Sequence, residues 1–147
     1  MDNIKWGGSG IEEVVYLWIL NNIPKGSSII ELGAGYVSTN VLRHEYKLTS
    51  VEHNPLYVNL YENVNYILAT IVNDWYDLTK LPKAELVFID GLNRKGILDN
   101  MHLFNKSAKF LIHDTYRPEE IDLAHKLGAF LKREPVFFTE GDYFAVI

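Results

Sequence analysis

The chain has 147 residues, of which 48% are apolar, with a formal net charge of −5 and a pI of about 5.5. This length predicts a single domain over residues 1–147, and the acidic balance argues against a nucleic-acid-binding protein, which normally has a basic face. Because cysteine is absent, disulfides and thiolate metal sites are excluded. The longest apolar stretch, near residues 14–20, is far shorter than the roughly 18 residues of a membrane span, and the N-terminus has no signal-peptide pattern. We therefore expect a cytoplasmic protein that does not associate with membranes.

The first half of the chain alternates helical and strand-like patterns. Ser9 and Glu12 form a capping-box signature ahead of apolar residues with helical spacing, and Pro24 ends that helix. A second helix is expected over Thr39–Glu45, and Asn54-Pro55 has the pattern of a further helix start. Three strands are expected in this half: Ser28–Leu32, Leu48–Glu52 and Tyr66–Ile71.

The second half continues the alternation and ends in two strands. Helices are expected over residues 97–104 and 118–132, the latter opened by Pro118. Gly141-Asp142 predicts an antiparallel hairpin between the last two strands. The strands expected in this half are Glu85–Ile89, Lys109–His113, Pro135–Thr139 and Tyr143–Ile147. The pattern predicts an α/β domain with seven strands in a mainly parallel sheet, and with helices between the first five.

The segment after the first strand has the composition of a ligand-binding turn. Glu31 is followed by Leu32, Gly33, Ala34 and Gly35, and then by a helix start. Glycine lets the backbone approach a ligand closely and adopt a positive φ. A pyrophosphate favours bare N–H groups at a helix start, whereas the carboxylate of Glu31 suits a ligand with a cationic end. S-adenosylmethionine (SAM), with its ammonium and sulfonium groups, is such a ligand.

Polar or aromatic side chains follow each of the first five strands. In open α/β sheets, ligands bind outside the carboxyl ends of the strands, at the point where the strand order reverses. The residues concerned are Glu31, Glu52, His53, Asp74, Trp75, Asp90, His113 and Asp114. Buried carboxylates are costly unless they are paired or hydrogen-bonded. Their gathering at one edge therefore indicates a binding or reaction site.

Besides Glu31 and Asp90, four of these residues are predicted to bind the cofactor. Glu52 stands where an acidic side chain meets ribose hydroxyls in nucleotide-binding βαβ units, and His53 lies beside it. Asp74 is placed to read an adenine edge, and Trp75 to stack on the base. The alternatives stay open: a solvated glutamate at a strand end, a loop aspartate and a core tryptophan.

The ends of the fourth and fifth strands supply the candidate reaction centre. Asp90 is a candidate contact for the SAM ammonium, for the substrate or for a metal. His113 and Asp114 are candidates for a general base, or for orienting an acceptor. The competing interpretation of His113 is a hydrogen-bonded structural residue.

Several motifs together resemble the class I SAM-dependent methyltransferases. Residues 31–35 resemble motif I of that family, and residues 51–54 resemble its acidic ribose-binding motif. Residues 86–91 and 109–115 are similar to those of small-molecule O-methyltransferase relatives, with Phe-Ile-Asp-Gly at the end of strand four and His-Asp at the end of strand five. The resemblance covers nearly the whole chain. It implies a three-layer Rossmann-like fold whose seven-stranded sheet ends in an antiparallel hairpin.

Two positions depart from the family pattern. Val37 replaces the third glycine of motif I. Asp90 and Asp114 match two positions of the catechol-type metal site, but Thr115 replaces the asparagine that completes it. Threonine is a poorer ligand than asparagine, so no metal is predicted.

The resemblance and the strand-end residues lead to one preferred function and two alternatives. The preferred function is methyl transfer from SAM to a small-molecule acceptor. The first alternative is a minimal module that binds SAM or a nucleoside without turnover. The second is an NAD-dependent oxidoreductase, whose fingerprint needs a glycine at position 38, where this chain has serine. Because the chain is short, we also expect a second subunit to complete the site in a homodimer.

Overall fold

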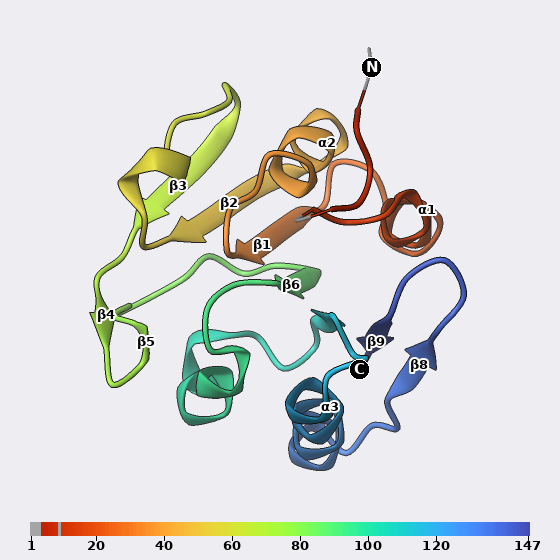
Figure 1. The fold of residues 1–147 in the computed structure, drawn as a ribbon. Coiled ribbons are helices and arrows are strands. Elements are labelled where there is room, and N and C mark those ends of the chain that lie inside the picture. Colours follow the sequence, from red (N-terminus) through yellow and green to blue (C-terminus); the bar gives the residue numbers. More distant parts are fainter. Residues whose placement is uncertain (1–3, 9) are drawn as a thin grey trace.

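The computed structural model describes residues 4–8 and 10–147 and contains a seven-stranded sheet with helices on both faces (Figure 1). The strand order is β3-β2-β1-β6-β7-β9-β8, parallel from β3 to β7 and antiparallel in the last two pairs. The sheet strands are β1 (Ser28–Leu32), β2 (Lys47–Glu52), β3 (Val64–Leu68), β6 (Leu86–Ile89), β7 (Lys109–His113), β8 (Val136–Phe138) and β9 (Phe144–Val146). The predicted fold class, including the antiparallel hairpin at the C-terminus, is confirmed.

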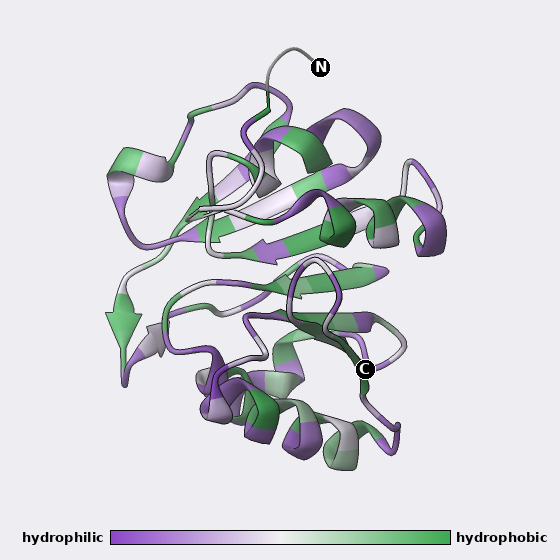
Figure 2. Cartoon of the chain, turned by 45° about the vertical axis from the view of Figure 1, so that its right-hand side comes forward, coloured by the Kyte–Doolittle hydropathy of each residue, from purple (hydrophilic) through white to green (hydrophobic). Residues whose placement is uncertain are grey.

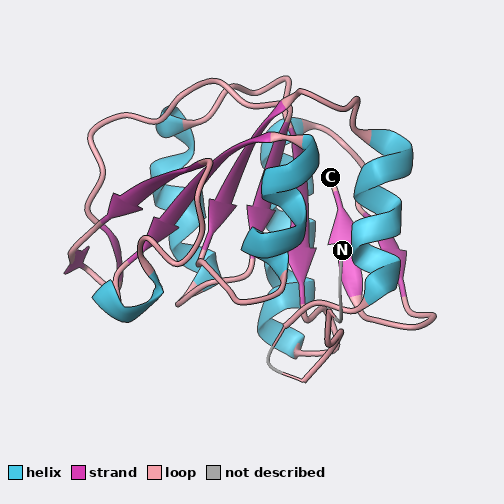
Figure 3. Cartoon of the chain, turned by 90° about the horizontal axis from the view of Figure 1, so that it is seen from above, coloured by secondary structure: helices cyan, strands magenta, loops and turns pink. Residues whose placement is uncertain are grey.

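Three α-helices and one 3₁₀ segment of the described chain cover the two faces of the sheet (Figure 3). The covering elements are α1 (Glu13–Asn22), α2 (Ser38–Glu45), α3 (Pro118–Leu131) and the 3₁₀ segment η2 (Arg94–Leu103). Helix α1 has Glu12 as its N-cap residue, without a side-chain capping bond. The capping box expected from Ser9 falls on a residue outside the described part of the chain. No helix among the described residues is both long and apolar enough to cross a membrane.

Strand β6 shows why the sheet is buried on both faces. Leu86 and Phe88 pack with α1 and α2, while Val87 and Ile89 pack with η2 and α3. Successive side chains of a strand point to opposite faces of the sheet. An unbroken apolar run therefore packs into the hydrophobic core on each face. Figure 2 shows this as hydrophobic strands in the middle of the molecule.

Three expected elements differ in the structure. The helix expected over residues 97–104 is the 3₁₀ segment η2, which starts three residues earlier. Asn54 caps a single 3₁₀ turn, η1 (Pro55–Tyr57), by accepting a hydrogen bond from the Leu56 N–H at 3.1 Å, and no longer helix forms there. The third strand ends at residue 68, and a separate hairpin of β4 (Ile71–Val72) and β5 (Trp75–Tyr76) follows it.

This hairpin explains why no helix connects β3 to β6. Its two turn residues, Asn73 and Asp74, have φ values of 51° and 62°. Consecutive positive φ values are typical of the two-residue turns that join antiparallel strands, and asparagine and aspartate tolerate them best. The segments η1 and η2 in the other connections are 3₁₀ helices, so α2 is the only α-helix among the described residues between β1 and β7. The expected pattern of helices between the first five strands is wrong in part.

Candidate functional site

The turns after β1 and β6 meet at the point where the strand order reverses. Gly33 has φ 97°, and a Cβ added to it would lie 2.5 Å from the Cα of Gly91. A Cβ on Gly91 would in turn lie 2.3 Å from the hydroxyl of Tyr76. The two backbones thus pack against each other with no room for side chains. This contact places both turns at the edge where open α/β sheets bind ligands.

Glu31 lies beneath the turn rather than on its surface. The hydroxyls of Ser38, Thr39 and Ser50 all donate to its carboxylate, that of Thr39 at 2.7 Å, and the side chain has no exposed area. Thr39 Oγ1 also accepts a hydrogen bond from the Gly35 N–H at 2.9 Å. Burial raises the pKa of Glu31 to about 7, although the three hydroxyls act in the opposite direction. Glu31 therefore braces the turn and the start of α2 from below, which differs from the direct ligand contact expected from sequence.

Glu52 joins the end of β2 to the same turn. Its Oε2 atom accepts a hydrogen bond from the Ala34 N–H at 3.1 Å, and its Oε1 atom accepts from the N–H groups of His53 and Asn54 at 2.8 and 2.9 Å. The side chain of His53 is 42% exposed, with Nδ1 at 2.9 Å from Glu52 Oε1. The structure thus brings together the glycine turn, Glu52 and His53, as the sequence predicted.

Trp75 and Asp74 are adjacent in the β4–β5 hairpin, but their side chains differ in exposure to solvent. Trp75 is buried, and its indole packs edge-on against Tyr76 and Phe104. A Cβ on Gly96 would lie 2.4 Å from the indole ring, so no ligand base fits against that side. The alternative of a core tryptophan is therefore correct, and the stacking role is not available in this conformation. Asp74 is exposed at the tip of the hairpin.

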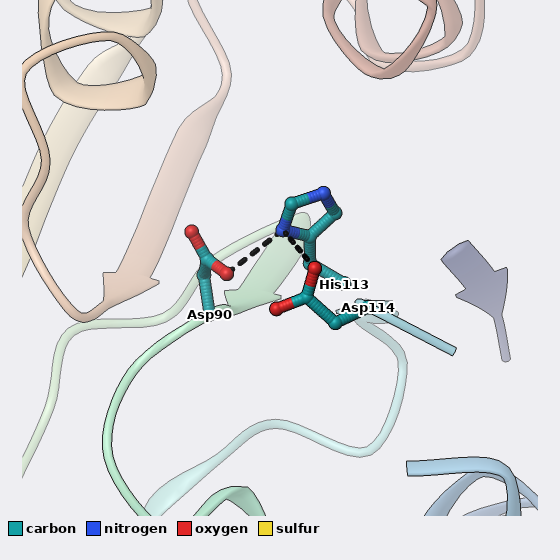
Figure 4. A group of neighbouring side chains, drawn as sticks. All are labelled: Asp90, His113 and Asp114. Carbon is teal, nitrogen blue, oxygen red and sulfur yellow. Dashed lines mark hydrogen bonds and ion pairs between the residues drawn. The ribbon is translucent and has the colours of Figure 1, made fainter. Parts of the chain in front are cut away.

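His113 lies among three carboxylates at the end of β7. Its Nδ1 atom is 2.9 Å from Asp90 Oδ1 and 3.6 Å from Asp114 Oδ1, so both aspartates converge on one ring nitrogen (Figure 4). Its Nε2 atom is 2.8 Å from Oδ2 of Asp142, in the turn between β8 and β9. Burial lowers the pKa of His113, but the hydrogen bond and charge of Asp90, together with Asp114 and Asp142, outweigh it and raise the pKa to about 9. The imidazole is therefore held as an imidazolium at neutral pH.

A buried arginine links the same two aspartates from the other side. Arg94 Nη2 lies 3.0 Å from Asp90 Oδ1 and 2.7 Å from Asp114 Oδ2, and its Nη1 lies 3.8 Å from Glu120 Oε1. Asp114 reaches this pair from a left-handed backbone conformation with φ 60°. Burial raises the pKa of Glu120, although the nearby charge of Arg94 acts against this.

The guanidinium of Arg94 occupies the place between Asp90 and Asp114 that a metal ion would need. One potential ligand atom from each of Asp90, His113 and Asp114 lies within 4.8 Å of the others. However, both carboxylates already bind the guanidinium, and the imidazole presents N–H groups rather than a lone pair. These residues do not fit a divalent cation.

Sequence reasoning missed three members of this cluster. In the sequence, Asp142 belongs to a predicted turn, and nothing in the local pattern indicates that its side chain contacts the end of β7. From the sequence alone, Glu120 is an ordinary acidic residue in the first turn of a helix. Arg94 follows Asp90 by four residues, a spacing that favours an ion pair on a helix, and this was the one signal that could have revealed it.

The comparisons with known proteins support the fold and leave the activity open. No family model matches the chain, and no curated protein matches it in sequence. The C-terminal domain of precorrin-6Y C5,15-methyltransferase from Rhodobacter capsulatus has a TM-score of 0.66 at 14% identity, covering 96% of this chain and 90% of that one. A TehB-like SAM-dependent methyltransferase from Corynebacterium glutamicum has a TM-score of 0.57 at 13% identity, covering 99% and 87%.

A third similar structure carries a different activity in its name. Precorrin 8w decarboxylase from Methanobacterium thermoautotrophicum has a TM-score of 0.60 at 13% identity, covering 99% of this chain and 94% of that one. The chain therefore has the fold of the class I SAM-dependent methyltransferases, which confirms the resemblance at the level of the fold. Because one fold hosts several chemistries, the function must be argued from the site.

Proposed function

We propose that this protein is a methyltransferase that transfers the methyl group of SAM to a small-molecule acceptor. The observation that carries the proposal is the hydrogen bond from the Ala34 N–H to Glu52 Oε2. This bond ties the glycine turn after β1 to the acidic residue after β2, at the edge of the sheet where nucleotide-like ligands bind. A carboxylate at this edge also favours a ligand that carries positive charge, as SAM does.

Each side of the edge has a separate role in the proposal. Glu52 would accept a hydrogen bond from a ribose hydroxyl at Oε2, because a carboxylate oxygen has two lone pairs and Oε2 has only the Ala34 N–H as its present donor, whereas Oε1 already accepts from two backbone N–H groups. The turn of Gly33, Ala34 and Gly35 would hold the aminocarboxypropyl end, with Glu31 bracing it from below. Asp90 and Asp114 lie one and two strands away from β1, on the side where an acceptor would approach.

The chemical demands on the protein are modest. SAM, when bound, supplies a methyl group on a sulfonium that is already a good leaving group. The chain's own residues have to position the acceptor in line with the methyl group and keep water away. The rigid Gly33–Gly91 contact and the Asp90–Arg94–Asp114 ion pairs provide a preorganised surface for that alignment.

Calorimetry with SAM, S-adenosylhomocysteine (SAH) and NADH tests the proposal. We expect both sulfur compounds to bind and NADH not to bind. Glu52→Gln should weaken SAM binding by about tenfold, the loss typical of one hydrogen bond to a charged group, while the exposed Glu134→Gln should leave it unchanged. A failure of SAM to bind even at millimolar concentration would reject the methyltransferase. Binding without methyl transfer to any acceptor would favour the SAM-binding module instead.

A further inference from the structure

The hydrogen bonds of His113 leave its ring without a free lone pair. Carboxylate oxygens lie 2.9 Å from Nδ1 and 2.8 Å from Nε2. A neutral imidazole carries only one N–H, so one of these contacts would set a nitrogen lone pair against a carboxylate. With Asp90 and Asp142 both ionised, both distances are satisfied only when both nitrogens carry a proton. His113 is therefore a cation that can donate two hydrogen bonds and cannot take a proton from an acceptor.

The groups packed around His113 keep its imidazole ring protonated. Asp90 comes from the end of β6, Asp114 from the end of β7, and Asp142 from the hairpin turn, while the ring of Phe88 packs at 6.3 Å between centroids. The side chain of His113 is 6% exposed, so water cannot replace these partners. The histidine is fixed as a structural cation, and this geometry favours the alternative of a hydrogen-bonded structural residue over a general base.

The other histidine near this edge lies on the cofactor side. His53 follows β2, which is separated from β6 and β7 by β1. Its Nδ1 atom lies 2.9 Å from Glu52, the residue proposed to bind the ribose. Among the described residues at the ends of β6 and β7, the negatively charged groups that can accept a proton are carboxylates.

The more accessible oxygens of this cluster are those of Asp90 and Asp114. Their side chains are 18% and 19% exposed, about three times the value for His113. In the described structure, Asp90 Oδ2 has no hydrogen bond, and Asp114 Oδ1 has only its 3.6 Å approach to His113. Two carboxylate oxygens are thus available to a ligand that donates hydrogen bonds or carries positive charge.

We propose that the acceptor is an amine, methylated on nitrogen beside Asp90 and Asp114; this inference rests on the proposed function. The lone pair of a neutral amine forms the new N–C bond to the methyl group while the C–S bond breaks and its electron pair stays on sulfur. The product is an N-methylammonium ion that keeps its protons, and the two carboxylates stabilise its charge. An amine that arrives as an ammonium ion first releases one proton to solvent, so the transfer itself needs no protein base.

A hydroxyl acceptor would need a general base, which this site does not provide. It must lose its proton as it attacks, which requires a base whose pKa lies near the working pH. A carboxylate is a much weaker base than an alkoxide or phenoxide, and so is a poor acceptor for the proton of an alcohol or phenol. The locked imidazolium cannot substitute for it. The geometry thus favours nitrogen over oxygen.

Incubating the protein with trideuteromethyl-SAM and a small-molecule cell extract identifies the atom that is methylated. We expect mass spectrometry to find the label on amine nitrogens, with a rate that rises with pH toward the pKa of the amine. Label on oxygen or carbon would overturn the amine inference and leave the methyltransferase intact. Absence of any labelled product, with SAM bound, would reject the methyltransferase and the inference together.

The protonation of His113 gives a readout that does not depend on methyl transfer. In the SAH complex, ¹⁵N NMR should show both ring nitrogens protonated at neutral pH and up to about pH 8. Asp142→Asn should lower the pKa of His113 by roughly one unit, because it removes one of the charges that face the ring. Asp99→Asn, an exposed aspartate in η2, should leave it unchanged. A neutral His113 ring at neutral pH would overturn the inference.

Discussion

Asp142 Oδ2 lies 2.8 Å from His113 Nε2, so the turn between the last two strands contacts the end of β7. The same carboxylate oxygen accepts a hydrogen bond from the backbone N–H of Glu12 at 3.3 Å, at the start of α1. One side chain therefore connects the C-terminal hairpin, the first helix and the centre of the carboxyl edge. The charge on His113 is consequently coupled to the packing of three distant segments.

This coupling predicts that stability falls as the solution becomes alkaline. The pKa of His113 is raised from 6.5 to about 9, so the folded protein holds this proton more tightly than the unfolded chain. Its contribution is complete below about pH 6.5 and is lost as the pH rises through about 9, a change of up to about 3 kcal/mol. Urea unfolding between these pH values measures it. His113→Gln should flatten this dependence, whereas the exposed His125→Gln should preserve it; an unchanged slope in His113→Gln would contradict the assignment.

The raised pKa of Glu31 predicts a second change in the free energy of unfolding, at a lower pH than the change due to His113. Burial raises its pKa from 4.5 to about 7, so the protonated form is favoured in the folded state. Its contribution is complete below about pH 4.5 and disappears as the pH rises through about 7, by up to about 3 kcal/mol. Glu31→Gln should therefore remove a pH-dependent loss of unfolding free energy between these values, as measured by denaturant titration. Glu134→Gln, on the surface, should retain the wild-type profile, and a Glu31→Gln profile identical to it would refute the prediction.

The contact between the turns predicts a large difference between two glycine substitutions. Gly33 and Gly26 both have positive φ, 97° and 82°, so alanine is strained at either position. Only at position 33 does the new methyl group collide with another backbone, that of Gly91; at position 26 there is open space. We expect Gly33→Ala to lower the free energy of unfolding by at least about 2 kcal/mol more than Gly26→Ala, because overpacking adds to strain. Equal melting temperatures for the two variants would rule out the close contact.

The buried ion pairs of Arg94 predict that its replacement strongly lowers the stability of the protein, although Arg94 takes no direct part in the methyl transfer. Arg94→Met leaves Asp90, Asp114 and Glu120 without their common cation, and breaking a buried ion pair in this way costs about 3–5 kcal/mol. Lys95→Met, at the exposed neighbouring position, should cost less than about 0.5 kcal/mol. Thermal unfolding of the two variants makes the comparison. If Arg94→Met melted like Lys95→Met, the guanidinium would not be holding the two aspartates.

The same arrangement predicts that divalent cations do not affect the wild-type protein. Adding Mg²⁺ or a chelator should leave both the melting temperature and SAM binding unchanged, because the guanidinium already fills the space between Asp90 and Asp114. Calorimetry and thermal unfolding with and without the cation provide the check. Stabilisation of the wild-type protein by Mg²⁺ would show that the ion displaces Arg94.

Local patterns were sufficient for much of the fold. The bounds of β1 and β7 match the expected strands residue for residue. Both strands lie in the middle of the sheet, where apolar runs are long and end at polar residues. The expected helix after Asn54 failed because a cap and a proline mark only a start, and the residues that follow supply no buried face to extend it.

The candidate site was predictable in position but not in chemistry. Placing Glu52 and Asp90 at one edge needs only strand ends and parallel topology. The burial of Trp75 depends on the packing of Gly96 and Phe104, which lie more than twenty residues further along the chain. The protonation of His113 likewise depends on Asp142, which is 29 residues away in sequence.

The sequence by itself determined the parallel sheet, the turn of Gly33 and Gly35, and the row of acidic residues at its carboxyl edge. Periodicity, glycine and strand-end polarity are local properties, and local physics is enough to interpret them. Only the tertiary structure decided that Glu31 supports the turn from below, that Arg94 stands between two aspartates, and that His113 is a cation. A charge state is set by every group within a few ångströms, and those groups come from segments that only folding brings together.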